Sequence, residues 1–216
     1  MRRGSIRYDF DLVLAGDFRE AGEVAETMAS HLASLAGRGL ELGLLWLRDP
    51  ALSRSTPVTD RLADLVRRHI AVPLPPELGA VSCRVLILYQ PHLLAGALPD
   101  WPRLTAAVTL AVLCGAPDLR DQAAALGAAA DIIAGRLSRR QLWCPATPQI
   151  RAQCREHLGG LELSAHDLPP LEPIAAWRTE RALPRRQRPI LGRMLRPDDD
   201  ALPAKREALL AAHPAE

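Results

Sequence analysis

The feature that most constrains this chain is a short apolar run near its start that ends at a glycine. Leu12 to Ala15 are four consecutive apolar residues, and Gly16 follows them directly. A continuous apolar run is typical of a parallel strand that is buried on both faces of its sheet. A helical pattern then begins near Gly22. The order strand, glycine turn, helix predicts the first unit of an open α/β sheet, which binds its ligands at the carboxyl ends of its strands.

The same alternation of strand and helix continues along the next 140 or so residues. We predict further strands at 40–47, 72–74, 83–89, 107–113 and 142–144, and helices at about 24–35, 58–70, 118–137 and 148–157. With 48% apolar residues, the chain can bury a core of ordinary size. The pattern therefore predicts an α/β fold with a Rossmann-like, doubly wound and mainly parallel sheet.

The texture of the sequence changes after about residue 165, where prolines and arginines become frequent. We expect one Rossmann-like domain at 1–165 and an extended linker at 166–188, which Trp177 could anchor to the domain. Residues 189–216 look like the start of a second domain that is truncated, because a new apolar run at Pro189 to Leu191 comes too late to complete a sheet.

Composition excludes several classes of protein and function. A net charge of +2 argues against a dedicated nucleic-acid binder, and no apolar run is long enough to predict a membrane-spanning helix. The cysteines form no C-x-x-C pair and lie in apolar surroundings, so we expect buried free thiols and a reducing, cytoplasmic compartment; they are Cys83, Cys114, Cys144 and Cys154. Histidines and carboxylates lack metal-ligand spacing, so we expect no bound metal and no cofactor.

A basic stretch from Arg178 to Arg196 admits three interpretations. A solvated linker between domains needs only its low apolar content, and we favour that interpretation. A membrane-surface patch would suit an enzyme that acts on lipid-linked glycans at the inner face of the membrane. A nucleic-acid site would need interleaved aromatic residues, which this stretch lacks.

Three blocks of sequence resemble one family, in its order. "DFDLVLAGDFREAG" resembles the opening of bacterial sugar-nucleotide glycosyltransferases of the two-domain GT-B type, often G-D-F-R-x-P-G-G-T. "LWCPATPQIRAQ" resembles their W-A-P-V-G-P-x-V-R segment, and "RPILGRMLRPDDDALP" resembles the R-P-V-I-G-R-H-S-R-P-D-P-L-K-W-P with which their second domain begins. The resemblance implies one half of a GT-B fold, in which an acceptor-side domain faces a domain that binds a nucleoside-diphosphate sugar.

The resemblance implies transfer of a sugar from that donor to a glycan or a lipid-linked acceptor. Departures from the family pattern bear on the donor: Glu23 stands where the family has glycine, and Ala201 stands where it has lysine. Both changes disfavour an anionic diphosphate. We therefore expect the 216-residue chain to be inactive by itself. A non-catalytic Rossmann-like binding or interaction module, and more weakly a small nucleotide-binding protein, are the alternatives.

Candidate substrate-binding residues follow from their places at strand ends and from the resemblance; they are Gly16, Asp17, Arg19, Gly22, His92 and Arg193. The two glycines either approach a ligand or serve only the turn. Asp17 either caps a helix or lies at the surface, which we favour, or faces an acceptor hydroxyl as a base. His92 is either a polar loop residue or a contact of the acceptor. By resemblance, Arg193 is the cation at the start of the second domain.

Overall fold

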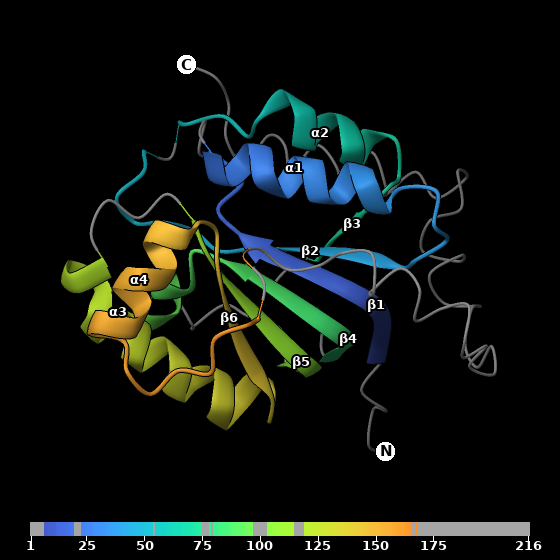
Figure 1. The fold of residues 1–216 in the computed structure, drawn as a ribbon. Helices are drawn as coiled ribbons and strands as arrows, with labels where there is room; N and C mark the ends of the chain where they lie inside the picture. The colour runs from blue at the N-terminus through green and yellow to red at the C-terminus, as the bar shows by residue number, and fades with distance from the viewer. Residues whose placement is uncertain are drawn as a thin grey trace.

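A computed structural model describes residues 7–19, 23–53, 55–74, 78, 80–96, 103–114, 119–165 and 167 of the chain (Figure 1). Strands and helices alternate along this part of the chain. They are β1 (Arg7–Gly16), α1 (Glu23–Leu35), β2 (Leu42–Trp46), α2 (Asp60–Arg67), β3 (Val72–Leu74), β4 (Ala80–Tyr89), η1 (Pro91–Ala95), β5 (Arg103–Leu113), α3 (Leu119–Ile132), η2 (Ile133–Leu137), β6 (Gln141–Pro145) and α4 (Pro148–His157).

The six strands form one sheet in the order β3-β2-β1-β4-β5-β6, and every neighbouring pair is parallel. The predicted Rossmann-like sheet is therefore confirmed. The strand order reverses between β1 and β4, because β2 and β3 lie on one side of β1 whereas β5 and β6 lie on the far side of β4. In sheets of this kind the crevice outside the carboxyl ends of the strands at the reversal is the usual ligand site.

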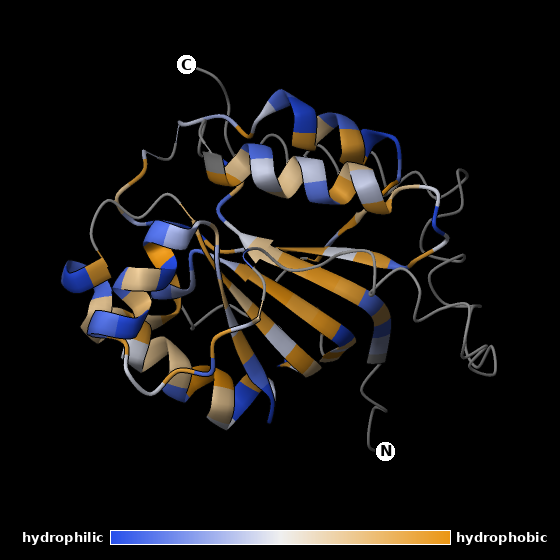
Figure 2. Cartoon of the chain, in the orientation of Figure 1, coloured by the Kyte–Doolittle hydropathy of each residue, from blue (hydrophilic) through white to orange (hydrophobic). Residues whose placement is uncertain are grey.

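Two helical layers enclose the sheet (Figure 1). Helices α1 and α2 cover one face through an apolar cluster that includes Met28, Leu32 and Leu62. Helices α3 and α4 share a second cluster with the other face, where Trp143 is fully buried. Figure 2 shows the resulting pattern, with mostly apolar strands between helices that carry hydrophilic residues among their apolar ones. The sheet is thus buried on both faces over most of its area, as the continuous apolar runs predict.

In the three neighbouring strands β1, β4 and β5, the side chains switch sheet faces by one residue, at positions that lie opposite one another. In β1, Tyr8 and Phe10 belong to the same apolar cluster as Val13 and Ala15, so the alternation of faces shifts by one residue at Asp11. The N–H groups of Asp11 and Leu12 both donate to the Glu41 carbonyl, which is the hydrogen-bonding signature of a bulge.

Strands β4 and β5 shift at the same level, at Arg84 and Ala107, because their pairing resumes in register on either side. On the N-terminal side of these positions one face of the sheet is polar, and there Asp9 pairs in register with Ser82 and is hydrogen-bonded to it. On the C-terminal side of these positions both faces are apolar. The predicted strands began at residues 83 and 107 instead of at Ala80 and Arg103, so they missed the N-terminal ends of β4 and β5.

Other predicted elements agree closely with the structure. Helix α4 spans the predicted residues 148–157, and α3 continues through the π-helical turn η2 to Leu137, as predicted. Helix α2 ends at Arg67 rather than at residue 70, because His69 adopts a left-handed conformation (φ 57°) that terminates the helix. All four cysteines are buried and free, as expected. The predictions for Trp177, the linker at 166–188 and the second domain at 189–216 concern residues outside the described part, apart from Asp167.

No helix among the described residues is long and apolar enough to cross a membrane.

Gly43 offers a test of how tightly the sheet surface is packed. A Cβ at this position would lie 3.1 Å from both Leu74 Cδ1 and Val13 Cγ2, which are buried in the same cluster. We expect Gly43→Ala to lower the free energy of unfolding by about 1–3 kcal/mol, because the neighbouring side chains must move. Urea unfolding monitored by circular dichroism measures the change.

Gly127 provides the matched control, because a Cβ there meets nothing within 4 Å and the residue lies in the exposed interior of α3. We expect Gly127→Ala to raise the free energy of unfolding by about 0.5–1 kcal/mol through helix propensity alone. Equal effects of the two substitutions would show that packing around Gly43 is looser than the structure indicates.

Candidate functional site at the carboxyl edge of the sheet

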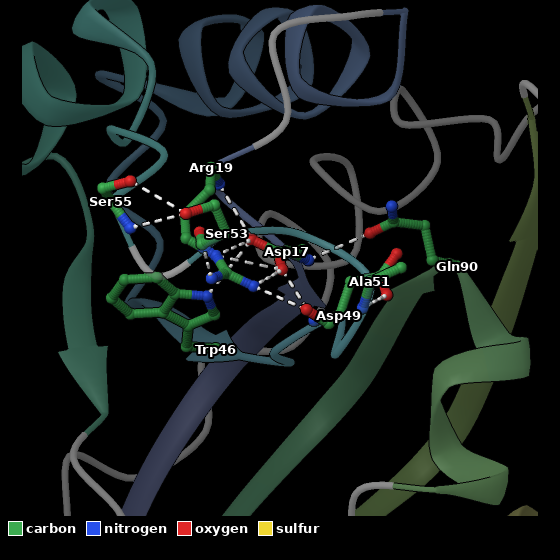
Figure 3. A network of polar contacts seen from close by, with 8 residues as sticks. All are labelled: Asp17, Arg19, Trp46, Asp49, Ala51, Ser53, Ser55 and Gln90. Atoms are coloured by element: carbon green, nitrogen blue, oxygen red, sulfur yellow. Dashed lines mark hydrogen bonds and ion pairs between the residues drawn. The ribbon is translucent and has the colours of Figure 1, made fainter.

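The loops that follow β1, β2 and β4 meet at the point where the strand order reverses (Figure 3). They bring together polar residues that lie far apart in the sequence: Asp17 and Arg19 after β1, Asp49 after β2, and Gln90 and His92 after β4. Two of the candidate residues predicted from the sequence, Gly22 and Arg193, lie outside the described part of the chain.

Gly16 ends β1 and is needed for packing. A Cβ on this residue would lie 3.0 Å from Met28 Sδ and 3.2 Å from Tyr89 Cβ, so α1 and β4 leave little room for a side chain. The carbonyl of Gly16 accepts a hydrogen bond from Leu47 N at 2.9 Å, which joins the ends of β1 and β2. Of the two roles open for Gly16 in the sequence, the structure supports the close packing of the turn.

Asp17 and Arg19 form a buried ion pair, and both side chains are almost completely enclosed (0% and 2% exposed). Arg19 Nη2 donates to Asp17 Oδ2 at 2.7 Å, and Arg19 Nε donates to Oδ1 at 3.1 Å. The backbone N–H of Arg19 donates to the same Oδ1 at 2.9 Å. This two-pronged contact is the geometry in which a guanidinium binds a carboxylate most strongly.

The ion pair also fastens the loop after β2. Asp49 N donates to Asp17 Oδ2 at 2.7 Å, and Trp46 Nε1 donates to Asp17 Oδ1 at 3.4 Å. Arg19 donates to two carbonyls of the same loop, to Asp49 O from Nη2 at 2.8 Å and to Ser53 O from Nη1 at 3.0 Å. A buried charge is tolerated when its hydrogen-bonding capacity is used in this way.

The surroundings of Asp17 keep it ionised. Burial acts to raise the pKa of the Asp17 carboxyl, but the Arg19 guanidinium and the N–H groups of Asp49 and Arg19 outweigh it and hold the pKa below its usual value. The expected surface role of Asp17 is therefore wrong, because its carboxylate is buried and bonded to the loop after β2, whereas the capping role concerns the start of α1, which follows residues outside the described part. Arg19 does lie at the predicted edge, but its guanidinium binds groups of the protein itself.

Gln90 completes the junction from the side of β4. Its Oε1 accepts a hydrogen bond from Asp17 N at 3.0 Å, across the point where the strand order reverses. Gln90 adopts a left-handed conformation (φ 55°, ψ 55°), which is rare for a residue other than glycine and marks a position held by its surroundings. Sequence reasoning missed Gln90, although its place directly after a predicted strand and before Pro91 was the available signal.

His92 lies beyond Gln90 on η1 and is half-buried. Burial lowers the pKa of the His92 imidazole, while the negative charge of Asp49 acts in the opposite direction. The Asp49 carboxylate is oriented by accepting a hydrogen bond from Ala51 N at 2.8 Å. The predicted candidate His92 thus lies at the same sheet edge as Asp49, a carboxylate that sequence reasoning did not select and whose charge acts on the imidazole. A neutral imidazole on which a carboxylate charge acts is suited to accepting a proton from a hydroxyl group.

A second polar pair, between His31 of α1 and Tyr89 of β4, lies inside the layer under α1. His31 Nδ1 and the Tyr89 hydroxyl are hydrogen-bonded, and Tyr89 is fully buried. Burial lowers the pKa of His31 and raises that of Tyr89, so both side chains are neutral at pH 7. This pair joins α1 to the central strand.

Within the described ranges, no group of three or more His, Cys, Asp or Glu side chains could hold a metal ion. The thiols are buried rather than activated, and burial raises the pKa of Cys83 to about 12. The carboxyl edge presents charged and hydrogen-bonding side chains.

Comparison of the chain with models of known protein families, with curated proteins and with solved structures finds no match. The functional argument therefore depends on the geometry of the site and on the sequence motifs.

The buried ion pair predicts that replacing Arg19 lowers the free energy of unfolding far more than replacing the exposed Arg61. We expect Arg19→Met to lower the free energy of unfolding by about 3–5 kcal/mol, because Asp17 would remain buried without its partner. Arg61→Met removes an exposed ion pair with Glu26 of similar length (2.8 Å) and should cost at most about 1 kcal/mol. Urea unfolding of both variants measures the difference, and similar costs would mean that water reaches the Asp17 carboxylate.

Two half-buried histidines, His31 and His92, predict a dependence of stability on pH. Because burial lowers the pKa of His31 and His92 below the model-peptide value of 6.5, the unfolded chain takes up these protons first as the pH falls. Their contribution to stability is complete above about pH 6.5 and is lost as the pH falls toward the lower pKa values of the folded state.

Urea unfolding at pH 7.5, 6.5 and 5.5 tests this dependence. The wild-type protein should lose more stability between pH 7.5 and 5.5 than the double variant His31→Gln/His92→Gln. An unchanged slope in the double variant would show that carboxyl groups alone account for the dependence.

Proposed function

We propose that this chain is the acceptor-side domain of a glycosyltransferase that uses a nucleoside-diphosphate sugar, and that His92 contacts the acceptor. The observation that carries the proposal is the position of half-buried His92 directly after β4 at the carboxyl edge, where the strand order reverses and where the charge of Asp49 acts on the imidazole. The three ordered motif blocks, which resemble glycosyltransferases of the GT-B type, supply the reaction class.

In this proposal His92 and Asp49 assist one proton transfer from the acceptor. Transfer breaks the bond between the sugar and the diphosphate and forms a bond to an acceptor oxygen, which loses its proton. A ring nitrogen of neutral His92 can hydrogen-bond the acceptor hydroxyl and take that proton, and the Asp49 carboxylate would stabilise the imidazolium that forms. Burial keeps the pKa of His92 below 6.5, so the imidazole is in the required neutral form at pH 7.

The donor needs cations that lie elsewhere than in the buried ion pair. A leaving diphosphate is stabilised by N–H groups and positive side chains, but the Arg19 guanidinium is buried and donates to Asp17, Asp49 and Ser53. In the proposal these contacts come from Gly22 and Arg193 by resemblance, together with a donor-binding domain. The chain by itself is then inactive. No cofactor takes part, and the nucleotide sugar is a substrate.

The partners follow from the same proposal. The acceptor is a glycan or a lipid-linked sugar, and no nucleic acid is involved. The protein acts in the cytoplasm, where the basic stretch from Arg178 to Arg196 would allow peripheral contact with the inner face of the membrane.

The buried ion pair specifically favours one other candidate function. A Rossmann-like domain whose first loop is closed by internal hydrogen bonds, with Gln90 Oε1 on Asp17 N, is also what a non-catalytic binding or interaction module would show. Such a module would keep the fold without binding either substrate.

Ligand binding by the full chain separates these functions. Saturation-transfer NMR with a panel of oligosaccharides should detect binding at millimolar concentration, and His92→Gln should weaken it about tenfold, as expected when one strong hydrogen bond is lost. His69→Gln, at an exposed position beyond α2, is the matched control and should leave binding unchanged.

Nucleoside diphosphates and their sugars should not stabilise the chain alone. A ligand at 100 times its Kd would raise the free energy of unfolding by about 2.7 kcal/mol, so such a gain would favour a nucleotide-binding protein instead. Failure of both ligand classes to bind would favour the non-catalytic module.

A further inference from the structure

We propose that Arg48, directly after β2, is the residue at this edge that binds an oxyanion, either a phosphate or a carboxylate group. That this group belongs to the acceptor rests on the proposed function, whereas the binding of the oxyanion does not. The sequence places Arg19 among the candidate substrate-binding residues of this edge. The contacts of the two arginines favour Arg48 instead.

Arg19 is poorly placed to bind a ligand of this kind, because its guanidinium is buried and already donates to Asp17, Asp49 and Ser53. Arg48 differs in each respect. Its side chain is exposed, and it makes no hydrogen bond or ion pair with another residue in the described part of the chain. Its full set of N–H donors is therefore open to solvent or to a ligand.

Trp46 holds the Arg48 guanidinium in place. The Arg48 Cζ lies 5.2 Å from the centre of the Trp46 ring, which is within the range of a cation–π contact. The ring is itself oriented, because Trp46 Nε1 donates to Asp17 Oδ1 and Phe18 packs 6.0 Å away. An arginine stacked in this way loses less conformational entropy when it binds an anion than a free surface arginine would.

The location fits a substrate contact rather than a general surface charge. Arg48 precedes Asp49 in the chain, and Asp49 is the carboxylate that acts on His92. Asp49 would repel an anion in part, but its carboxylate is turned to Ala51 N, with which it is hydrogen-bonded. The planar guanidinium fork matches the two oxygens of a phosphate or carboxylate group.

Titration of the full chain with inorganic phosphate at constant ionic strength tests this proposal. The indole N–H signal of Trp46 and the Nε–H signal of Arg48, followed by NMR, should shift together with a Kd in the millimolar range. Arg48→Gln should weaken phosphate binding about tenfold, which corresponds to the loss of one charge-assisted contact. Trp46→Leu should weaken it by a smaller factor, because the charge remains but its orientation is lost.

Arg38→Gln is the matched control, because Arg38 is also exposed but lies between α1 and β2, away from the carboxyl edge. It should leave phosphate binding unchanged. Parallel titrations with methyl phosphate and with glucuronate distinguish the two kinds of group, and the tighter of the two identifies the natural one. Each of these results would support Arg48 as the site.

The proposal is overturned if phosphate moves neither signal, or if Arg48→Gln and Arg38→Gln bind phosphate equally well. Unchanged circular dichroism of the variants verifies that they are folded. Phosphate binding in a chain that binds no oligosaccharide would retain the Arg48 site while the acceptor-side function fails, so the two failures are distinguishable.

Discussion

The buried Asp17–Arg19 ion pair is the interaction on which the carboxyl edge of this protein depends. Its carboxylate receives the Arg19 guanidinium and the Asp49 N–H, and the guanidinium in turn reaches the carbonyls of Asp49 and Ser53. Two charges withdrawn from water are costly unless most of their hydrogen-bonding groups find partners, and here the loop after β2 supplies many of them. The loop is consequently held against the end of β1, where it orients Trp46 and Asp49.

This arrangement divides the polar residues of the edge into two sets with different roles. Asp17, Arg19 and Gln90 face inward and satisfy one another and the backbone, so they hold the junction together. His92, Asp49 and Arg48 lie around this junction and are half-buried or exposed. In the proposed function the outer set contacts the ligands, and the inner set positions it. The division explains how a site can lack the cation that its sequence motif suggests and still present charged groups to a ligand.

The shift of sheet face in the central strands shows how much of a strand its hydropathy pattern predicts. Before Asp11, Arg84 and Ala107 the strands alternate between apolar and polar residues, and after them the runs are continuously apolar. Alternation indicates one wet face and continuity indicates two buried faces, so both halves of each strand are consistent with their sequences. The predicted strands at 83–89 and 107–113 used only the continuous halves. The shift of face at one shared level follows from pairing among three strands, which no single run records.

The sequence by itself determined the alternation of strands and helices, the parallel sheet, the burial of the cysteines and the location of polar residues after β1 and β4. These properties are local, because periodicity and apolar continuity report the burial of each segment separately. The tertiary structure decided which polar residues pair with one another. Asp17 meets Trp46, Asp49 and Gln90, which are 29, 32 and 73 residues away, only because β1 lies between β2 and β4. Strand order therefore decides that Arg19 is enclosed and that Arg48 is exposed, and no local pattern of either arginine carries that information.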